Sequence, residues 1–123
     1  MSMERAIKDF PKQFLFEPVI ENADKLQKKP AAIVSGMGGS HLAADLLKSV
    51  HPALTIFIHR SYGLPSMHEA YFSNCLFVAS SYSGNTEEVL DGLEEAHKKG
   101  MATAIIAMGG RLEEIALEYN IPF

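Results

Sequence analysis

Apolar residues along the chain follow two alternating patterns. Four short runs are apolar at consecutive positions, which favours strands buried on both faces. Between these runs, apolar residues recur every three or four positions, which predicts amphipathic helices. The predicted strands are residues 31–35, 54–59, 75–80 and 102–108, and the predicted helices are residues 40–50, 85–100 and 111–120. Alternation of strand and helix at this spacing predicts an α/β fold, a three-layer αβα sandwich around a mainly parallel sheet.

Both ends of the chain depart from this alternation. Residues 3–26 have a helical pattern that Pro11 and Pro18 interrupt, so we expect two short helices or one kinked helix. The last four residues, "NIPF", have the composition of the start of a fifth strand. The chain is therefore divided into an N-terminal helical segment, residues 1–29, and an α/β domain, residues 30–123, truncated at its last strand.

Two loops follow predicted strands and lead into helices: "GMGGSH", residues 36–41, and "SYSGNT", residues 81–86. In a five-stranded sheet of order 2-1-3-4-5, the flavodoxin-type topology, the strands before these loops are neighbours, and both loops face one crevice. Their glycines allow close approach to a ligand, and helix N-termini favour an anion. Their hydroxyl groups, which can donate to phosphate oxygens, belong to Ser40, Ser81, Ser83 and Thr86. The pattern predicts a site for a phosphate ester.

Helix capping accounts for part of the same pattern without a ligand. Asn85 followed by Glu88 resembles a capping box, and Ser40 is placed to cap the next helix. Capping leaves the serines of residues 81–86 unexplained. Two nucleotide motifs fit less well, because His41 replaces the small residue of the dinucleotide fingerprint and the Gly-Lys-Ser/Thr of a P-loop is missing.

Composition and charge narrow the class of function. The 123 residues are 47% hydrophobic with a formal net charge of −4, so we expect a packed domain and no nucleic acid partner. No stretch approaches the roughly 20 apolar residues of a membrane span, and the N-terminus is charged where a signal peptide is apolar. Cys75 is the single cysteine, which argues against a disulfide or a cysteine metal site. We expect a cytoplasmic protein that uses no metal or cofactor and does not bind a membrane.

Three motifs, "GMGGS", "YGLP" and "SYSGNTEE", carry a resemblance to a known family. In this order and spacing they resemble the sugar isomerase (SIS) domain, most closely the first such domain of the bifunctional phosphoglucose/phosphomannose isomerases. The resemblance implies a five-stranded αβα sandwich that binds a sugar phosphate. It also implies that Ser81, Ser83 and Thr86 hold the phosphate, while Gly39 and Ser40 lie against the sugar. The candidate substrate-binding residues are Gly38, Gly39, Ser40, His41, Ser81, Ser83 and Thr86.

The chain also departs from the family pattern. His41 stands where family members often have a small residue, and we keep it as a candidate ligand contact. The acid/base Glu and His of the family lie beyond the first domain, so the catalytic residues stay unknown. Two functions are open: the substrate-binding half of an aldose–ketose isomerase for hexose 6-phosphates, or a regulatory module that binds a sugar phosphate without turnover.

Sugar isomerase domains generally pair, so the resemblance implies a homodimer or a second such domain. Apolar residues of the N-terminal segment, which need cover, support self-association. They are Phe10, Phe14, Leu15 and Phe16.

Overall fold

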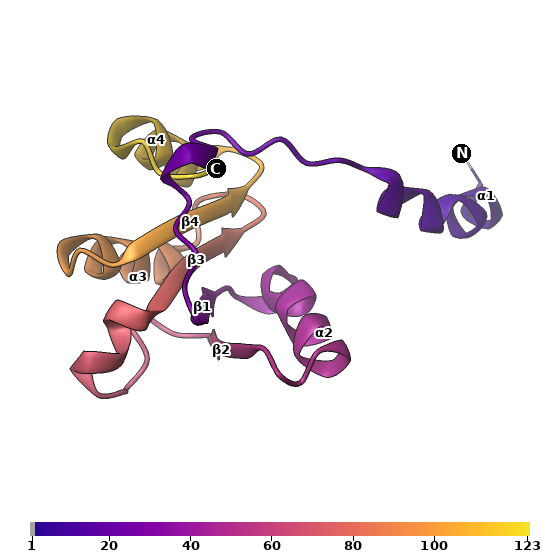
Figure 1. Ribbon diagram of the computed structural model, residues 1–123. Coiled ribbons are helices and arrows are strands. Elements are labelled where there is room, and N and C mark those ends of the chain that lie inside the picture. Colours follow the sequence, from indigo (N-terminus) through magenta and orange to yellow (C-terminus); the bar gives the residue numbers. More distant parts are fainter. Residues whose placement is uncertain (1) are drawn as a thin grey trace.

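A computed structural model describes residues 2–123 and contains one sheet among them. Its strands are β1 (Ala31–Ser35), β2 (Thr55–His59), β3 (Cys75–Ser81) and β4 (Ala102–Ala107). All neighbouring strands are parallel, and their order is β2-β1-β3-β4 (Figure 1). The predicted α/β class, the parallel pairing and the order of these strands are therefore confirmed.

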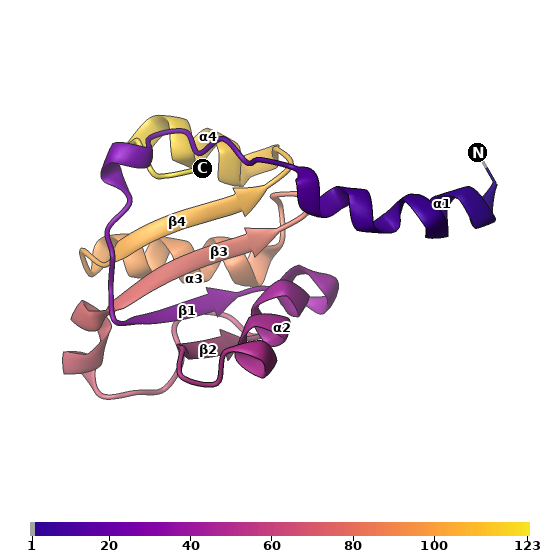
Figure 2. The same cartoon turned by 45° about the vertical axis from the view of Figure 1, so that its right-hand side comes forward.

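Helices lie on both sides of this sheet. They are α1 (Met3–Asp9), α2 (Leu42–Val50), α3 (Glu87–Lys98) and α4 (Gly110–Tyr119), with short 3₁₀ segments at Phe10–Leu15, Ala23–Lys25, Gly38–His41 and Glu69–Asn74. The step from β1 to β2 and the step from β3 to β4 run in opposite directions across the sheet, so right-handed crossovers place their helices on opposite faces. Figure 2 shows α2 in front of the sheet and α3 behind it. The arrangement is compatible with a three-layer sandwich.

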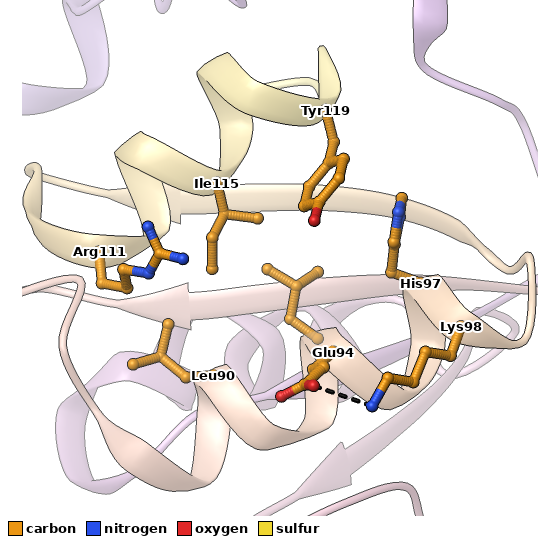
Figure 3. A pocket seen from close by; sticks show the side chains of 8 residues that line it. Leu90, Glu94, His97, Lys98, Arg111, Ile115 and Tyr119 are labelled. Carbon is orange, nitrogen blue, oxygen red and sulfur yellow. Dashed lines mark ion pairs between the residues drawn. The ribbon is translucent and has the colours of Figure 1, made fainter.

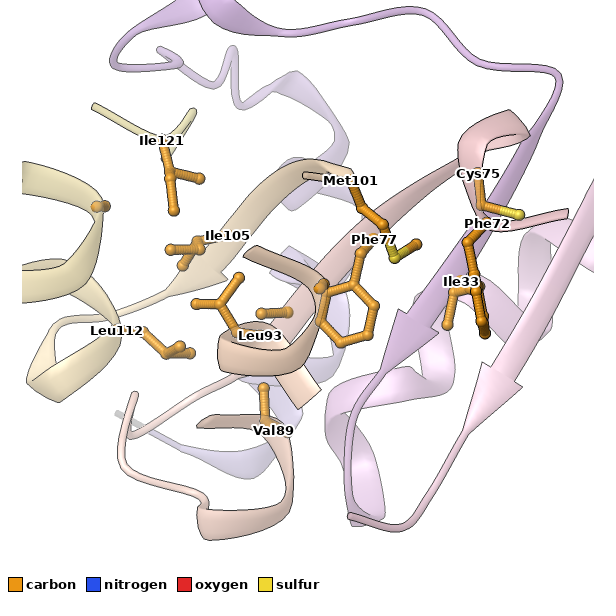
Figure 4. Packing of buried hydrophobic residues seen from close by; sticks show 13 residues of the cluster. Ile33, Phe72, Cys75, Phe77, Val89, Leu93, Met101, Ile105, Leu112 and Ile121 are labelled. Atoms are coloured by element: carbon orange, nitrogen blue, oxygen red, sulfur yellow. The ribbon is translucent and has the colours of Figure 1, made fainter. Parts of the chain in front are cut away.

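The hydrophobic core lies between the sheet and helices α3 and α4. Ile33 and Phe77 of the sheet are fully buried, and Leu93 of α3 and Leu112 of α4 pack in the same cluster (Figure 4). Fully burying one such side chain is worth about 1.5–3 kcal/mol. On the other face, Ile106 of β4 is 64% exposed, so the expectation that every strand is buried on both faces is wrong for β4. The reason is that α2 packs mainly against β2, which lies at the opposite edge of the sheet from β4.

The predicted fifth strand is not confirmed: the sheet formed by residues 2–123 has four strands. The tail after α4 lies beside β4, where the Ile105 N–H donates to the Pro122 carbonyl at 2.8 Å. Proline has no N–H to donate back to β4, so Pro122 contributes one ladder bond and not two. The next residue, Phe123, exchanges two backbone hydrogen bonds with Glu21 instead, at 2.8 and 3.0 Å.

Helix α1 and the 3₁₀ helix Phe10–Leu15 project from the body of the molecule, while the later part of the N-terminal segment runs along it (Figures 1 and 2). As predicted, the helical pattern is interrupted at Pro11, which lies at the start of the 3₁₀ helix after α1, but a third piece, the 3₁₀ helix Ala23–Lys25, was not predicted. None of the three pieces buries a side chain among the residues described. The domain boundary at residues 29 and 30 stays a prediction.

Candidate functional site

Two loops meet at the carboxyl edge of the sheet: the glycine loop, residues 36–40, and the serine loop, residues 81–86. They leave the neighbouring strands β1 and β3. The Ser80 hydroxyl donates to the Ser40 carbonyl at 2.6 Å, and the Tyr82 N–H donates to the Ser40 hydroxyl at 3.4 Å. The sequence-based expectation that both loops face one crevice is therefore met by direct contacts.

Three hydroxyl groups gather within the serine loop. Ser81 Oγ lies 2.7 Å from Thr86 Oγ1 and 3.5 Å from Ser83 Oγ. Ser81 is buried and also accepts from the Gly84 N–H at 3.1 Å, so its hydroxyl shapes the loop from within. Ser83 is exposed and Thr86 half-buried. These two hydroxyls are the ones available to an incoming anion.

The N-terminus of α3 lies directly at this cluster. Its N-cap residue is Thr86, whose hydroxyl contacts Ser81 and makes no capping bond within residues 2–123. The capping box suggested by Asn85 and Glu88 is therefore wrong: the Asn85 side chain accepts from the Arg111 N–H at 2.9 Å. First-turn N–H groups and the helix dipole favour an anion at such a position.

Capping does not account for Ser40 either. The N-cap of α2 is His41, and Ser40 lies within the 3₁₀ turn Gly38–His41 that precedes the helix. Gly38 has φ of 56°, a left-handed conformation that glycine adopts without strain. An open groove of about 580 Å³ lies between this turn and the ends of β3 and β4. Gly39 and Ser40 line one side of it, and Tyr82 and Met108 line the other.

A third loop, residues 108–110, leads from β4 into α4 and supports the serine loop. The sequence analysis missed it. The Gly84 carbonyl accepts from the Leu112 N–H at 2.9 Å, and the Tyr82 carbonyl accepts from the Met108 N–H at 3.1 Å. A side chain at Gly84 would place its Cβ only 1.8 Å from the Gly109 carbonyl oxygen. The available signal was the Gly109–Gly110 pair, because it follows β4 at the same edge of the sheet.

Sequence comparison adds an independent observation. No protein-family model matches the chain. A bifunctional phosphoglucose/phosphomannose isomerase from Thermoplasma acidophilum is 40% identical over 86 residues, which are 70% of this chain and 27% of the relative. The enzyme of the same name from Caldicellulosiruptor bescii is 37% identical over 87 residues, 68% of this chain and 25% of the relative.

The chain is a relative of the bifunctional phosphoglucose/phosphomannose isomerases. It spans about a quarter of the length of these curated relatives. A D-glucosamine-6-phosphate 4-epimerase from Sulfolobus acidocaldarius is also similar, with 36% identity over 88 residues, 71% of this chain and 27% of that enzyme. These matches agree with the resemblance carried by the glycine and serine loops.

His41, a candidate ligand contact from the sequence, is the N-cap residue of α2. Its ring Nδ1 contacts the carboxylate of Asp45 one turn further along α2, and its side chain is 11% exposed. His41 follows Ser40 directly in the chain. Its ring pairs with Asp45 of α2, however, and is not among the groups that line the groove.

The "YGLP" motif is fixed against α3 by three carboxylates spaced one turn apart. The Tyr62 hydroxyl donates to Glu87 at 3.1 Å, and the backbone N–H groups of Gly63 and Leu64 donate to Asp91 at 2.7 Å and Glu95 at 3.2 Å. The hydrogen bond to Glu87, with the nearby charge of Glu88, raises the pKa of Tyr62 above its ordinary value. These contacts hold the "YGLP" loop along α3.

The sequence analysis also missed Ser35. It ends β1 at the carboxyl edge, is 1% exposed, and its hydroxyl has no hydrogen-bond partner among residues 2–123. Ser35 points to the α3 side of the sheet, as Ile33 does two residues earlier, because side chains alternate along a strand. No pattern in the sequence marked it, since a strand-ending serine is common.

A separate groove lies between α3 and α4 (Figure 3). Its floor is apolar, and its two strongest cations are already paired: Lys98 with Glu94 at 2.9 Å and Arg111 with Glu114 at 2.9 Å. The Glu94 carboxylate raises the pKa of Lys98. This groove therefore offers less to an anion than the carboxyl edge does.

Other kinds of site find little support in the part of the chain that is described. Residues 2–123 bring together no three His, Cys, Asp or Glu side chains that could hold a metal ion. Among the same residues, no helix has the length and apolar character needed to cross a membrane.

Proposed function

We propose that this chain binds a hexose 6-phosphate as the substrate-binding half of an aldose–ketose phosphosugar isomerase. The contact between the glycine loop and the hydroxyl-rich serine loop is the observation that carries the proposal. The names of the relatives support it, because each relative acts on, or is named for, a phosphorylated hexose.

In this proposal the serine loop takes the phosphate. Ser83 and Thr86 donate their hydroxyls to phosphate oxygens, together with N–H groups of the first turn of α3. Ser81 holds the loop in shape from inside. A ring of neutral donors at a helix N-terminus can bind a phosphate without a lysine.

The sugar then extends along the groove beside the glycine loop. Gly38 and Gly39 leave room for its ring, and Ser40 offers its hydroxyl. We place the protein in the cytoplasm, since that is where sugar phosphates are metabolised.

Isomerisation also needs a base that moves a proton between adjacent carbons and a group that assists ring opening. We place these groups on a second sugar isomerase domain that lies outside these 123 residues. The 123 residues alone should therefore bind the substrate with little or no turnover.

Thermal unfolding with and without ligand tests the proposal. Fructose 6-phosphate at about 100 times its Kd should stabilise the fold by roughly 2.7 kcal/mol, which raises Tm by about 5–15 °C. Free fructose should have almost no effect. A coupled assay should detect little or no conversion of glucose 6-phosphate to fructose 6-phosphate by the same sample.

Ser66→Ala is a matched control for Ser83→Ala. Both serines are exposed, but Ser66 lies beside Asn74 and Cys75, at the opposite end of β3. Ser83→Ala should reduce the shift in Tm, and Ser66→Ala should leave it unchanged. An equal shift with fructose and fructose 6-phosphate would mean that the phosphate site is misassigned.

A further inference from the structure

Tyr82 stands in the middle of the serine loop, and the sequence analysis did not single it out. Side chains alternate along a strand, so consecutive residues at the end of β3 point to opposite faces of the sheet. Ser81 points to the α3 side, where its hydroxyl contacts that of Thr86 at 2.7 Å. Ser80 points to the α2 side, where its hydroxyl donates to the Ser40 carbonyl at 2.6 Å. Tyr82 continues the alternation on the side of Ser80 and lines the groove beside the glycine loop.

The backbone of Tyr82 is held by both neighbouring loops. Its N–H donates to the Ser40 hydroxyl at 3.4 Å, and its carbonyl accepts from the Met108 N–H at 3.1 Å. The glycine loop and the loop after β4 therefore fix the point from which the tyrosine ring leaves the chain. A tyrosine has only two side-chain torsions to order, so a ring on a fixed backbone can contact a ligand at low entropic cost.

The groove of about 580 Å³ has a polar wall and an apolar wall. Ser40 belongs to the polar wall, and Tyr82 and Met108 belong to the wall on the other side. Ile106 of β4, in register with Ser80, adds an apolar side chain on the same face of the sheet. Ligand sites commonly combine apolar and aromatic walls with a few placed polar groups. A closed sugar ring has hydroxyls around its rim and C–H groups on its faces, so it matches both walls.

We propose that Tyr82 recognises the sugar, its ring packing on a C–H face of a closed hexose ring while Ser83 and Thr86 hold the phosphate. Because Tyr82 directly precedes Ser83, a sugar attached to a phosphate at Ser83 is brought close to the tyrosine. Ser40 then faces the hydroxyls on the rim of the sugar. The inference rests on the proposed function and adds to it the residue that distinguishes a hexose phosphate from phosphate alone.

A substitution at Tyr82 has two routes to change binding, because its chain neighbours Ser81 and Ser83 belong to the phosphate site. It removes the contact with the sugar, or it displaces the phosphate donors. Inorganic phosphate separates the two routes, since it occupies the phosphate site without a sugar.

Isothermal titration calorimetry with glucose 6-phosphate and with inorganic phosphate tests the role of Tyr82. Tyr82→Ala should raise the Kd for glucose 6-phosphate about three- to tenfold, the loss of one aromatic contact, and leave the Kd for inorganic phosphate unchanged. Tyr82→Phe should bind like the unsubstituted chain, because the contact uses the face of the ring and not its hydroxyl. Tyr71→Ala is the matched control, since Tyr71 is also exposed but lies in the 3₁₀ helix before β3. It should change neither Kd.

NMR signals of the tyrosine rings give a second measurement on the unsubstituted chain. The ring protons of Tyr82 should shift with glucose 6-phosphate and stay in place with inorganic phosphate. If Tyr82→Ala weakens both ligands equally, or weakens neither, this inference is overturned and the proposed function stands. No binding of glucose 6-phosphate by the unsubstituted chain would overturn the proposed function and this inference together.

Discussion

Gly84 is the residue on which the shape of the serine loop most depends. It has φ of 74°, and a Cβ there would lie 1.8 Å from the Gly109 carbonyl oxygen and 2.8 Å from the carbonyl carbon. Gly100 has nearly the same φ, 72°, but a Cβ there would have open space. The two glycines therefore separate the cost of the backbone conformation from the cost of the contact.

Gly84→Ala should destabilise the fold by more than about 3 kcal/mol, because the contact adds to the left-handed strain. Gly100→Ala should cost only about 1–2 kcal/mol, which is the strain alone. Urea unfolding of both variants measures the difference. Equal losses at the two positions would mean that the serine loop does not pack on Gly109 as described.

Cys75 should be unreactive in the folded chain. It is 2% exposed, and burial raises the pKa of its thiol, so little thiolate is present near neutral pH. A disulfide reagent such as DTNB should label the native chain at least about 100-fold more slowly than the chain in urea, because labelling requires opening of the core. Equally fast labelling of both would show that Cys75 is accessible.

Helix α3 is the element that contacts both the serine loop and the "YGLP" loop. Its N-terminus faces the serine loop, and its carboxylates hold the "YGLP" loop. Gly92 in its middle lets that loop approach, since a Cβ there would lie 2.8 Å from the Gly63 carbonyl oxygen and 2.9 Å from Phe77 Cζ. A glycine in a helix interior thus has a packing reason.

Gly92→Ala should destabilise the fold by about 1–3 kcal/mol through overpacking. The sign is informative, because the same substitution at an exposed helix position stabilises by up to about 1 kcal/mol. Thermal unfolding of the variant distinguishes the two cases. A higher Tm than that of the unsubstituted chain would contradict the close packing of the "YGLP" loop on α3.

Element types could be predicted from the sequence, but some boundaries could not. The apolar runs placed all four strands, and the helical spacing of Val89, Leu93 and Ala96 placed α3. The predicted start of α3 at Asn85 was wrong by two residues, because that side chain accepts from the Arg111 N–H. A contact between residues 26 positions apart leaves no trace in local periodicity.

At the scale of the whole molecule, the sheet order was predicted from the alternation of strands and helices and from the paired glycine and serine loops, while the sheet of residues 2–123 has four strands and not five. Apolar residues at the end of the chain favoured a strand, and the tail makes one backbone hydrogen bond with β4, from the Ile105 N–H to the Pro122 carbonyl. The candidate site could be predicted as far as two loops with glycines and hydroxyls at one edge. Its third loop and Ser35 could not, because their roles arise only when β4 and β1 lie beside β3.

Amide NMR of the isotopically labelled chain, titrated with fructose 6-phosphate, tests the central claim that the carboxyl edge binds a sugar phosphate. The largest shifts should fall on Ser83, Gly84 and Thr86 and on residues 36–40, and Ser83→Ala should weaken binding about tenfold. Free fructose should leave residues 81–86 unchanged. Shifts confined to the groove between α3 and α4, or the same shifts with fructose as with its phosphate, would contradict the account.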